Sequence, residues 1–514
     1  MKFGYLISLL STLSAFSSCS QSSSGGVSKP NIIIIYVDDL GYGDLSCYGA
    51  KAVNTPHIDE LATKGLLFTD AHSSASTCTP SRYSLLTGSY AFRNNAAILP
   101  GDAPLIIDPD GVSMADMLKD AGYATAVIGK WHLGLGSGKP NWNAEIKPGP
   151  KEIGFDYSFL IPATADRVPT VLVENQKVVN LDKNDPIAVD YNNKIGIFPT
   201  GLSSPELLKM KADTQHSGTI INGISRIGFM SGGSSAHWKD EDFASVLARK
   251  AKDFIAMYKD QPFFMYYALP SIHVPRSPNA RFVGATKMGP RGDDIVQMDW
   301  MVGEIMKNLR EAGIEKNTLV IFSSDNGPVL DDGYSDRAVE LIGKHQPSGI
   351  YRGGKYSAYE GGTRMPTITY WPDVIKPGTS DALFSQVDIF ASLARLIGQE
   401  MNSSKTAPDS QDMSEVLLGK SKNGRSNMVQ ESFTLSIRSG DWKYIEPVSK
   451  EVPVWLADKD IETGLINHAQ LYHLKEDQKE KNNLAEKYPE KVKILKEELH
   501  QIKINGHRLL DSKK

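Results

Sequence analysis

One cysteine of this chain is placed where its side chain could take part in catalysis. Cys78 opens the segment Cys78-Thr79-Pro80-Ser81-Arg82, and Leu86-Thr87-Gly88 follows it. The segment predicts a helix beginning at Cys78, and a helix N-terminus lowers the pKa of a thiol placed there. The plain interpretation is a buried or mildly reactive cysteine. The alternative is a nucleophile, which needs partners from elsewhere in the fold.

Oxygen-bearing side chains follow two apolar segments that lie far apart in the chain. Asp38-Asp39 comes directly after the run 31–37, and Asp325-Asn326 comes directly after the run 318–323. Three carboxylates gathered at one edge would repel one another unless a cation lay among them. Oxygen ligands alone favour Ca²⁺ or Mg²⁺ over zinc. The pattern therefore predicts a hard-metal site made of Asp38, Asp39, Asp325 and Asn326.

Two more apolar runs also end in polar residues. The run 124–128 leads to Lys130 and His132, and the run 263–269 leads to His273. Lys130 and His132 are two residues apart, so an extended segment would point both the same way. Helical patterns separate the four runs, at 55–64, 113–121, 242–258 and 294–312. This alternation predicts an α/β fold with a large, mostly parallel sheet sandwiched by helices, and ligands in such sheets bind beyond the carboxyl ends of the strands.

These motifs together resemble the signatures of type I, formylglycine-dependent sulfatases of the alkaline phosphatase superfamily. Two segments of the chain carry the resemblance further. The second family signature is matched by Gly129-Lys130-Trp131-His132-Leu133-Gly134, and a downstream family segment is matched by Arg352-Gly353-Gly354-Lys355. The resemblance runs from about Asn31 to Ala485. It implies an alkaline phosphatase-like fold and hydrolysis of sulfate esters.

The resemblance also implies how Cys78 is used. In the family a maturation enzyme oxidises this cysteine to Cα-formylglycine, whose hydrate is the nucleophile. A cysteine that captured sulfate would have no easy way to release it, whereas one hydroxyl of a gem-diol takes the sulfuryl group and the other expels it. The partners expected are that maturation enzyme and a sulfated glycan.

The remaining roles are carried over from the family by position. A calcium ion held by Asp38, Asp39, Asp325 and Asn326 is expected to polarise the sulfate. Arg82 and Lys130 are expected to stabilise the nucleophile and the developing charge. His273, with Lys355, is expected at the leaving-group oxygen, and His132 is expected to act as the base of the second step.

The N-terminus predicts export. Residues 1–19 read as a signal peptide ending in Phe16-Ser17-Ser18-Cys19, which looks like a lipobox, and residues 20–29 read as a flexible tether. We therefore expect lipidation at Cys19 and a periplasmic, lipid-anchored protein. Ordinary signal-peptidase cleavage in the same stretch is the alternative. With Cys78 oxidised as well, only Cys47 of the three cysteines remains, so no disulfide is expected.

The rest of the chain predicts two units and a specificity region. Residues 30–424 form the expected catalytic domain and residues 425–514 a smaller C-terminal α+β subdomain, with a small antiparallel sheet and a terminal helix. The long insertion 140–239 contains Asp166, Arg167 and His216, in segments that look like those of carbohydrate sulfatases from gut-type Bacteroidetes. These three could bind sugar hydroxyls, or they could only stabilise a loop. We expect an exo-acting enzyme on sulfated galactose or N-acetylgalactosamine, with 6-O-sulfate favoured.

Two other functions stay open at this point. One is a phosphomonoester or phosphonate hydrolase of the same superfamily, and the other is a non-catalytic, lipid-anchored binder of sulfated glycans. With a formal net charge of −4, the overall charge of the protein does not attract polyanions. Nucleic acid is therefore not an expected partner, and an anionic substrate must be bound by local cations.

Overall fold

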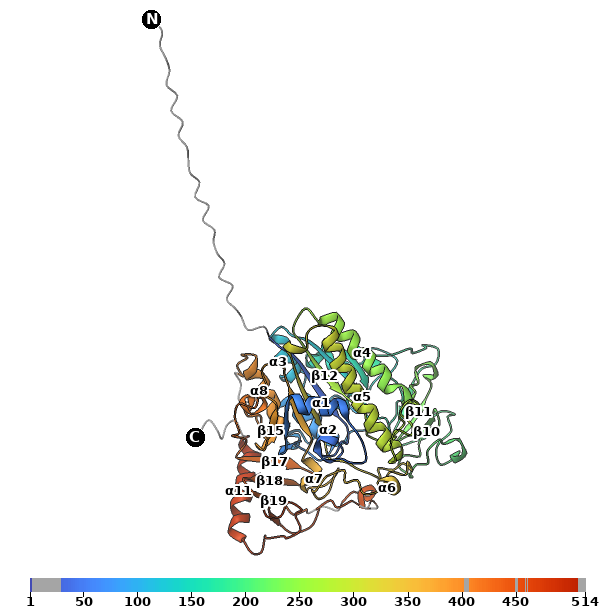
Figure 1. Cartoon of the computed structure of the whole chain (residues 1–514). Coiled ribbons are helices and arrows are strands. Elements are labelled where there is room, and N and C mark those ends of the chain that lie inside the picture. Colours follow the sequence, from blue (N-terminus) through green and yellow to red (C-terminus); the bar gives the residue numbers. More distant parts are fainter. Residues whose placement is uncertain (2–28, 402–405, 449–451, 458, 460, 507–514) are drawn as a thin grey trace.

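A ten-stranded, mostly parallel sheet organises the catalytic part of the chain (Figure 1). The computed structural model describes Met1 and residues 29–506 except 402–405, 449–451, 458 and 460. The strand order is β15-β2-β14-β13-β1-β12-β4-β5-β6-β7, and strands β13, β1, β12, β4 and β5 run parallel. The bounds are β1 Asn31–Val37, β2 Leu66–Phe68, β4 Ala124–Lys130, β5 Tyr157–Ile161, β6 Val173–Glu174, β7 Lys177–Val178, β12 Phe263–Ala268, β13 Thr318–Ser324, β14 Thr367–Tyr370 and β15 Gly378–Ser380.

Helices cover both faces of this sheet, which confirms the predicted fold class. Alternate residues of a strand point to opposite faces. Ile32 and Ile34 accordingly pack in one apolar cluster with helices α2, α3 and α8, and Ile33 and Ile35 pack in a second with α1, α4 and α5. The bounds are α1 Pro56–Lys64, α2 Cys78–Thr87, α3 Met114–Asp120, α4 Phe243–Tyr258, α5 Gly289–Glu311 and α8 Ile389–Leu396.

The helices begin within a residue or so of the predicted positions, with one exception. Helix α5 begins at Gly289, five residues before the expected 294, with a proline in its first turn. Proline suits that turn because its missing N–H has no partner there and its φ is already helical. The remaining short helices are α6 Ala338–Leu341, α7 Glu360–Thr363, α9 Ser414–Leu417 and α10 Val454–Ala457.

The C-terminal region forms its own antiparallel sheet, which packs beside the main body together with a long helix (Figure 1). Gly440, with a φ of 57°, turns the predicted hairpin. The bounds are β17 Asn427–Glu431, β18 Leu435–Ser439, β19 Trp442–Ile445, β20 Gln470–His473 and α11 Pro489–Asn505. The exact boundary at 424/425 stays a prediction, since buried ion pairs such as Lys443–Glu360 join the two parts.

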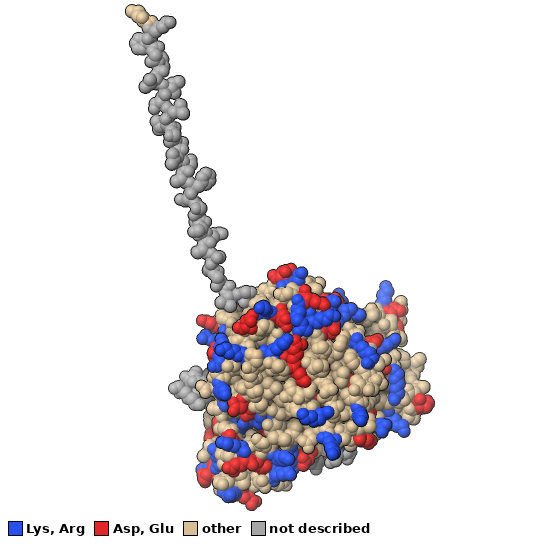
Figure 2. All heavy atoms as spheres, in the orientation of Figure 1, with Lys and Arg blue, Asp and Glu red and all other residues tan. Residues whose placement is uncertain are grey.

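The segment 140–239 is an irregular excursion from the sheet. Beyond β5 to β7 it forms only short antiparallel pairs: β8 Ala188–Asp190 with β11 Phe229–Ser231, and β9 Ile220–Ile221 with β10 Ile224–Ser225. The face shown in Figure 2 mixes acidic and basic side chains, in keeping with the small net charge. Among the described residues no helix is long and apolar enough to span a bilayer. Cys19, the signal segment and residues 20–28 lie outside the described part of the chain.

Candidate functional site

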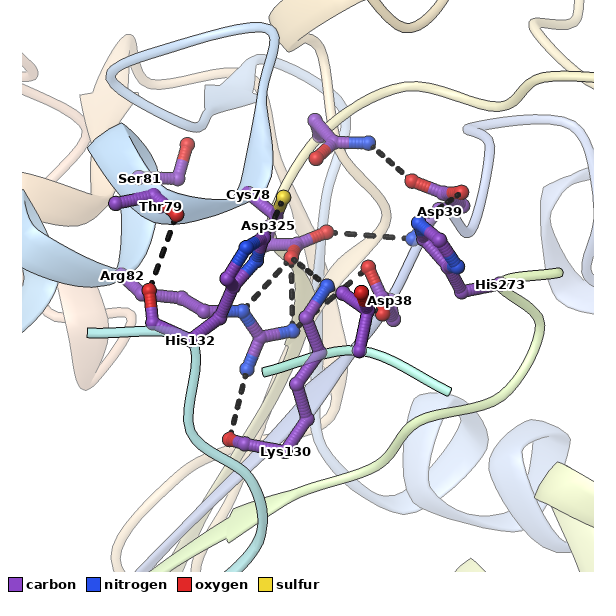
Figure 3. A network of polar contacts seen from close by, with 12 residues as sticks. Asp38, Asp39, Cys78, Thr79, Ser81, Arg82, Lys130, His132, His273 and Asp325 are labelled. Carbon is purple, nitrogen blue, oxygen red and sulfur yellow. Dashed lines mark hydrogen bonds and ion pairs between the residues drawn. The ribbon is translucent and has the colours of Figure 1, made fainter. Parts of the chain in front are cut away.

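The four predicted strand ends meet at one place. Strands β13, β1, β12 and β4 are neighbours and parallel, so their carboxyl ends share one edge of the sheet. Figure 3 shows the side chains that follow these strands pointing toward one another. Consecutive residues of a strand would point apart, but the backbone turns at Asp39 (φ 61°), so the carboxylates of both Asp38 and Asp39 reach the cluster.

The four predicted metal ligands form one buried cluster. The Asp39 backbone N–H donates to Asp325 Oδ1 over 3.2 Å, and Asn326 Nδ2 donates to Asp39 Oδ1 over 2.7 Å. Asp38 Oδ1 and Asn326 Oδ1 are buried and have no hydrogen-bond partner among the described residues. Burial raises the pKa of Asp38 well above its ordinary value; the nearby carboxylates add to this, although Lys130 and Arg82 oppose it.

These observations fit a hard cation. Buried oxygens without a donor are costly unless something electropositive lies beside them, and oxygen-only sets suit Ca²⁺ or Mg²⁺. Asp38, Asp39, Asn326 and Asp325 would hold the ion. One point goes beyond the sequence prediction: the ring of His273 also lies at this cluster, with Nε2 3.8 Å from Asp39 Oδ2.

Arg82 and Lys130 contact the acidic cluster directly. Arg82 donates through Nε and Nη2 to Asp325 Oδ2, at 3.0 and 2.7 Å, and Lys130 Nζ lies 2.5 Å from Asp38 Oδ2. Both cations are fully buried. In the folded chain they therefore fix the orientation of the carboxylates. Their predicted action on the nucleophile remains a prediction.

Cys78 is buried at the first position of α2, with its Sγ 3.2 Å from His132 Nδ1. Burial raises the pKa of this thiol, against the pull of Lys130 and Lys355. The sequence argument expected a lowered pKa for a thiol at a helix N-terminus, whereas in the folded chain burial raises it.

His132 presents an unprotonated nitrogen to residue 78. Its Nε2 lies 2.9 Å from the carbonyl oxygen of Leu99, which can only accept, so Nε2 carries the proton and Nδ1 is bare. Burial and the charges of Lys130 and Arg167 hold the pKa of His132 well below its ordinary value. The extended segment expected from Lys130 to His132 is wrong, since β4 ends at Lys130 and His132 has a φ of 54°. That turn brings the ring to Cys78.

Lys355 and His273 stand on the other side of residue 78. Lys355 Nζ donates to Asp39 Oδ2 over 3.0 Å and to Asp332 Oδ2 over 2.9 Å. His273 Nδ1 donates to the Val274 carbonyl over 2.7 Å, and its pKa is held well below the ordinary value by burial and by the nearby lysines. Asp332 was not predicted, because it lies in a loop sequence, Asp331-Asp332-Gly333, that does not directly follow a predicted strand.

A cavity of about 240 Å³ opens onto these groups. Its lining joins the chemical centre, represented by Cys78, His273 and Lys355, to the predicted substrate residues of the insertion. Arg82, Lys130, His132 and the four predicted metal ligands are not on that lining. The residues from the insertion are Asp166, Arg167 and His216.

The three insertion residues hold one another in fixed positions. Arg167 Nη1 donates to both carboxylate oxygens of Asp166, at 2.8 and 2.9 Å, and His216 Nε2 lies 3.5 Å from Asp166 Oδ2. Asp213, which was not predicted, accepts from His216 Nδ1 over 2.7 Å. Although burial opposes it, these two carboxylates raise the pKa of His216 to about 9. The ring is therefore an imidazolium at neutral pH.

The charges of this cavity wall suit a polyhydroxylated ligand. Burial favours the neutral acid, yet Arg167 and His216 hold the pKa of Asp166 well below its usual range, so the carboxylate stays charged. A carboxylate, a guanidinium and an imidazolium on one wall provide both acceptors and donors for hydroxyl groups.

Known proteins are similar to this chain over most of its length. A family model described as Sulfatase matches residues 30–399. The chain is 54% identical over 479 residues to the N-acetylgalactosamine-6-O-sulfatase of Bacteroides thetaiotaomicron, covering 92% of this chain and 93% of the relative. It is 33% identical over 407 residues to human arylsulfatase A, covering 78% of this chain and 70% of the relative.

Two solved structures are similar to this chain, one in sequence and fold and the other in fold alone. One from Bacteroides thetaiotaomicron, described with the metabolism of multiple glycosaminoglycans, superposes with a TM-score of 0.91 at 54% identity, covering 93% of this chain and 99% of that one. The phosphonate monoester hydrolase of Agrobacterium radiobacter has a TM-score of 0.55 at 17% identity, covering 92% and 95%, which shows a shared fold alone.

Proposed function

The chain belongs to the sulfatase family and is a sulfatase, and we propose that its substrate is a galactose-configured sugar carrying a 6-O-sulfate at the end of a glycan, N-acetylgalactosamine first. One observation carries the proposal. A single cavity of about 240 Å³ is lined both by Cys78, His273 and Lys355 and by Asp166, Arg167 and His216. A sulfate on a flexible exocyclic carbon can reach residue 78 while the sugar ring stays against the polar wall. The 54% identity to an N-acetylgalactosamine-6-O-sulfatase supports the same choice.

The net reaction is hydrolysis of the sulfate ester, in which water supplies the hydroxyl and the proton and the sulfur–oxygen bond to the sugar breaks. We propose that Cys78 is converted to formylglycine by a maturation enzyme, and that its hydrated aldehyde supplies the attacking hydroxyl. We further propose a calcium ion at Asp38, Asp39, Asp325 and Asn326, where it would supply a Lewis acid for a sulfate oxygen.

His132 is suited to act on residue 78 as a base. Its bare Nδ1 lies 3.2 Å from the side chain of that residue, and its Nε2–H is fixed on the Leu99 carbonyl. A low pKa keeps the ring neutral and able to accept a proton. A hydroxyl at residue 78 can thus lose its proton to Nδ1, which is the step that lets sulfate leave.

Lys355 is the group suited to the departing sugar oxygen. Both Lys355 and His273 line the cavity beside residue 78. Despite its burial, Lys355 stays charged, because Asp332 and Asp39 raise its pKa well above the ordinary value. A fixed ammonium stabilises an oxygen that gains negative charge and has protons to give to it, whereas the bare Nε2 of the neutral His273 ring can only accept a proton.

Export and anchoring remain part of the proposal. The lipobox-like sequence ending in Cys19 supports lipidation and a periplasmic location, and plain cleavage in the same stretch is the alternative. Phosphoester or phosphonate hydrolysis is the second candidate activity, but its support is the fold alone. Non-catalytic glycan binding has no observation in its favour.

The test of the substrate compares epimers. Matured protein is assayed on 6-sulfated N-acetylgalactosamine, 6-sulfated N-acetylglucosamine, 4-sulfated N-acetylgalactosamine and an aryl sulfate. Because polar groups left unpaired by the wrong epimer are costly, kcat/KM for the 6-sulfated galacto sugar should exceed that for the gluco sugar by at least about 100-fold.

Asp166→Ala should lose most of this preference, while a slow turnover of the aryl sulfate shows that the catalytic centre is intact. Equal rates on both epimers, or activity on aryl sulfates alone, contradict the substrate assignment. Faster hydrolysis of the matching phosphate esters would favour the second candidate activity.

A further inference from the structure

The catalytic cavity is too small for more than one sugar. Its volume of about 240 Å³ lies below the range of roughly 300–1,000 Å³ typical of small-molecule sites. If the sulfated sugar fills it, the next sugar of a glycan must lie outside.

A second cavity, of about 980 Å³, adjoins the first. It is formed by the segments 212–215 and 333–340 together with Trp455 and Lys459, and it shares Gln215 and Trp455 with the catalytic cavity. Gln215 and Trp455 thus form the border between the two cavities, and a ligand chain that occupies both cavities must cross this border.

Trp455 provides an aromatic surface at this border. Its ring packs edge-on against Tyr356, with centroids 5.1 Å apart, and against Phe433 at 6.2 Å. The Tyr356 hydroxyl in turn donates to the Asp332 carboxylate over 3.1 Å. The indole is therefore fixed in orientation relative to the catalytic cavity, as a stacking surface for a sugar ring needs to be.

Lys459 brings unused hydrogen-bond donors to the second cavity. Its side chain is 8% exposed, and its Nζ lies 3.8 Å from Asp213 Oδ2 and 3.9 Å from Asp332 Oδ1. Both distances exceed hydrogen-bond length, and this ammonium donates to no other described residue. A nearly buried ammonium without a close acceptor is costly, and a ligand oxygen would satisfy it.

We propose that the second cavity binds the sugar joined to the sulfated residue of the substrate, with its ring on Trp455 and its hydroxyl or carboxylate oxygens on Lys459. This inference rests on the proposed function, because it requires a glycan whose sulfated end occupies the catalytic cavity. The ring need not be charged, because the lining carries charges of both signs: Asp213 and Asp336 are paired with His216 and Arg276, and Asp331, Arg337 and Glu340 are also on it. The enzyme would then bind two consecutive sugars of its glycan substrate.

The experiment compares substrate lengths. The readout is the ratio of kcat/KM for a tetrasaccharide with a terminal 6-sulfated N-acetylgalactosamine to kcat/KM for the 6-sulfated monosaccharide. We expect a ratio of at least about 10 for the wild type, because one well-placed aromatic contact contributes on that order. Ser335 is exposed on the lining of the second cavity, so the indole of Ser335→Trp should obstruct the cavity and bring the ratio near 1.

A second variant and a control make the result interpretable. Trp455→Ala should also bring the ratio near 1, and the ratio cancels any loss that affects both substrates equally. Ser426→Trp changes an exposed serine that lines neither cavity, and it should keep the wild-type ratio. A wild-type ratio near 1, or a high ratio that both variants retain, overturns the second site and leaves the proposed function standing. No turnover of either substrate by matured wild type overturns the proposed function itself.

Discussion

Asp213→Asn should lower the pKa of His216 without disturbing its position. Asp213 Oδ1 accepts from both the backbone N–H and the ring Nδ1 of His216, at 2.9 and 2.7 Å. Asparagine keeps an oxygen for these donors and removes the charge, and it also replaces the oxygen 3.8 Å from Lys459 Nζ with an amide nitrogen. His216 would then have one carboxylate neighbour, Asp166, with an oxygen 3.5 Å from Nε2.

The size of the effect follows from the positions of the two carboxylates. A pKa of about 9 against an ordinary 6.5 corresponds to about 3 kcal/mol in favour of the imidazolium. Asp213 is closer to the His216 ring than Asp166, at 2.7 against 3.5 Å, but its side chain is 41% exposed and that of Asp166 only 4%. Solvent therefore screens the charge of Asp213 more strongly. We therefore expect the loss of Asp213 to lower the pKa of His216 by about 1, equivalent to about 1.4 kcal/mol.

The sign of the pH dependence is fixed by linkage. The pKa of His216 is raised in the folded state, so its contribution to stability is complete below about pH 6.5 and is lost as the pH rises through about 9. The variant should therefore be less stable than the wild type by about 1.4 kcal/mol at pH 6, and this difference should shrink by pH 9.5.

Histidine NMR titration measures the pKa, with His216→Gln to assign the signal, and urea unfolding at the two pH values measures the free energy. Asp182→Asn is the matched control, because Asp182 is an exposed aspartate whose side chain also accepts a backbone N–H. An unchanged His216 titration in Asp213→Asn would refute the argument that these carboxylates set the charge of the ring.

Three further outcomes are expected. Cys78→Ala should abolish sulfatase activity while leaving the fold intact, and mass analysis of the peptide 70–93 from native-host protein should show an aldehyde at residue 78; equal turnover by the alanine variant is incompatible with the proposed nucleophile. Chelation should abolish activity and Ca²⁺ should restore it, whereas restoration by zinc alone points to phosphatase chemistry. Cys19→Ala should move the protein from the membrane fraction to the soluble fraction; wild-type protein that is already soluble would favour plain secretion.

Much of the fold and the centre of the site could be predicted from the chain. The runs 31–37, 124–128, 263–269 and 318–323 predicted strands buried on both faces, and the structure places them side by side. A polar residue directly after such a strand must lie at the carboxyl edge, so the convergence of Asp38 and Asp325 follows from the strand pattern, and His273 lies on the loop that leaves the same edge. Lys130 was also found at a strand end, but its role and the conversion of Cys78 came from a family resemblance, which spacing alone could not supply.

Predictions from local sequence were wrong where residues distant in the chain set the environment of a side chain. The pKa of Cys78 is raised because the folded chain removes water from a helix N-terminus that looked favourable for a thiolate. His132 reaches Cys78 through a left-handed backbone conformation that breaks the period of an extended strand.

The sequence by itself determined the order of strands and helices, the residues at the strand ends and the family to which the chain belongs. Those features depend on the spacing at which apolar residues recur along the chain and on short motifs. Both are properties of residues that are near one another in sequence. Only the tertiary structure decided that Asp332 holds Lys355, that Asp213 charges His216, and that Trp455 lines two cavities. Asp332 and Lys355 are 23 residues apart and Asp213 and His216 only three, whereas Trp455 meets segments more than 100 residues away. These contacts lie in irregular loops and in the short helix α10, whose course has no period that the sequence could show.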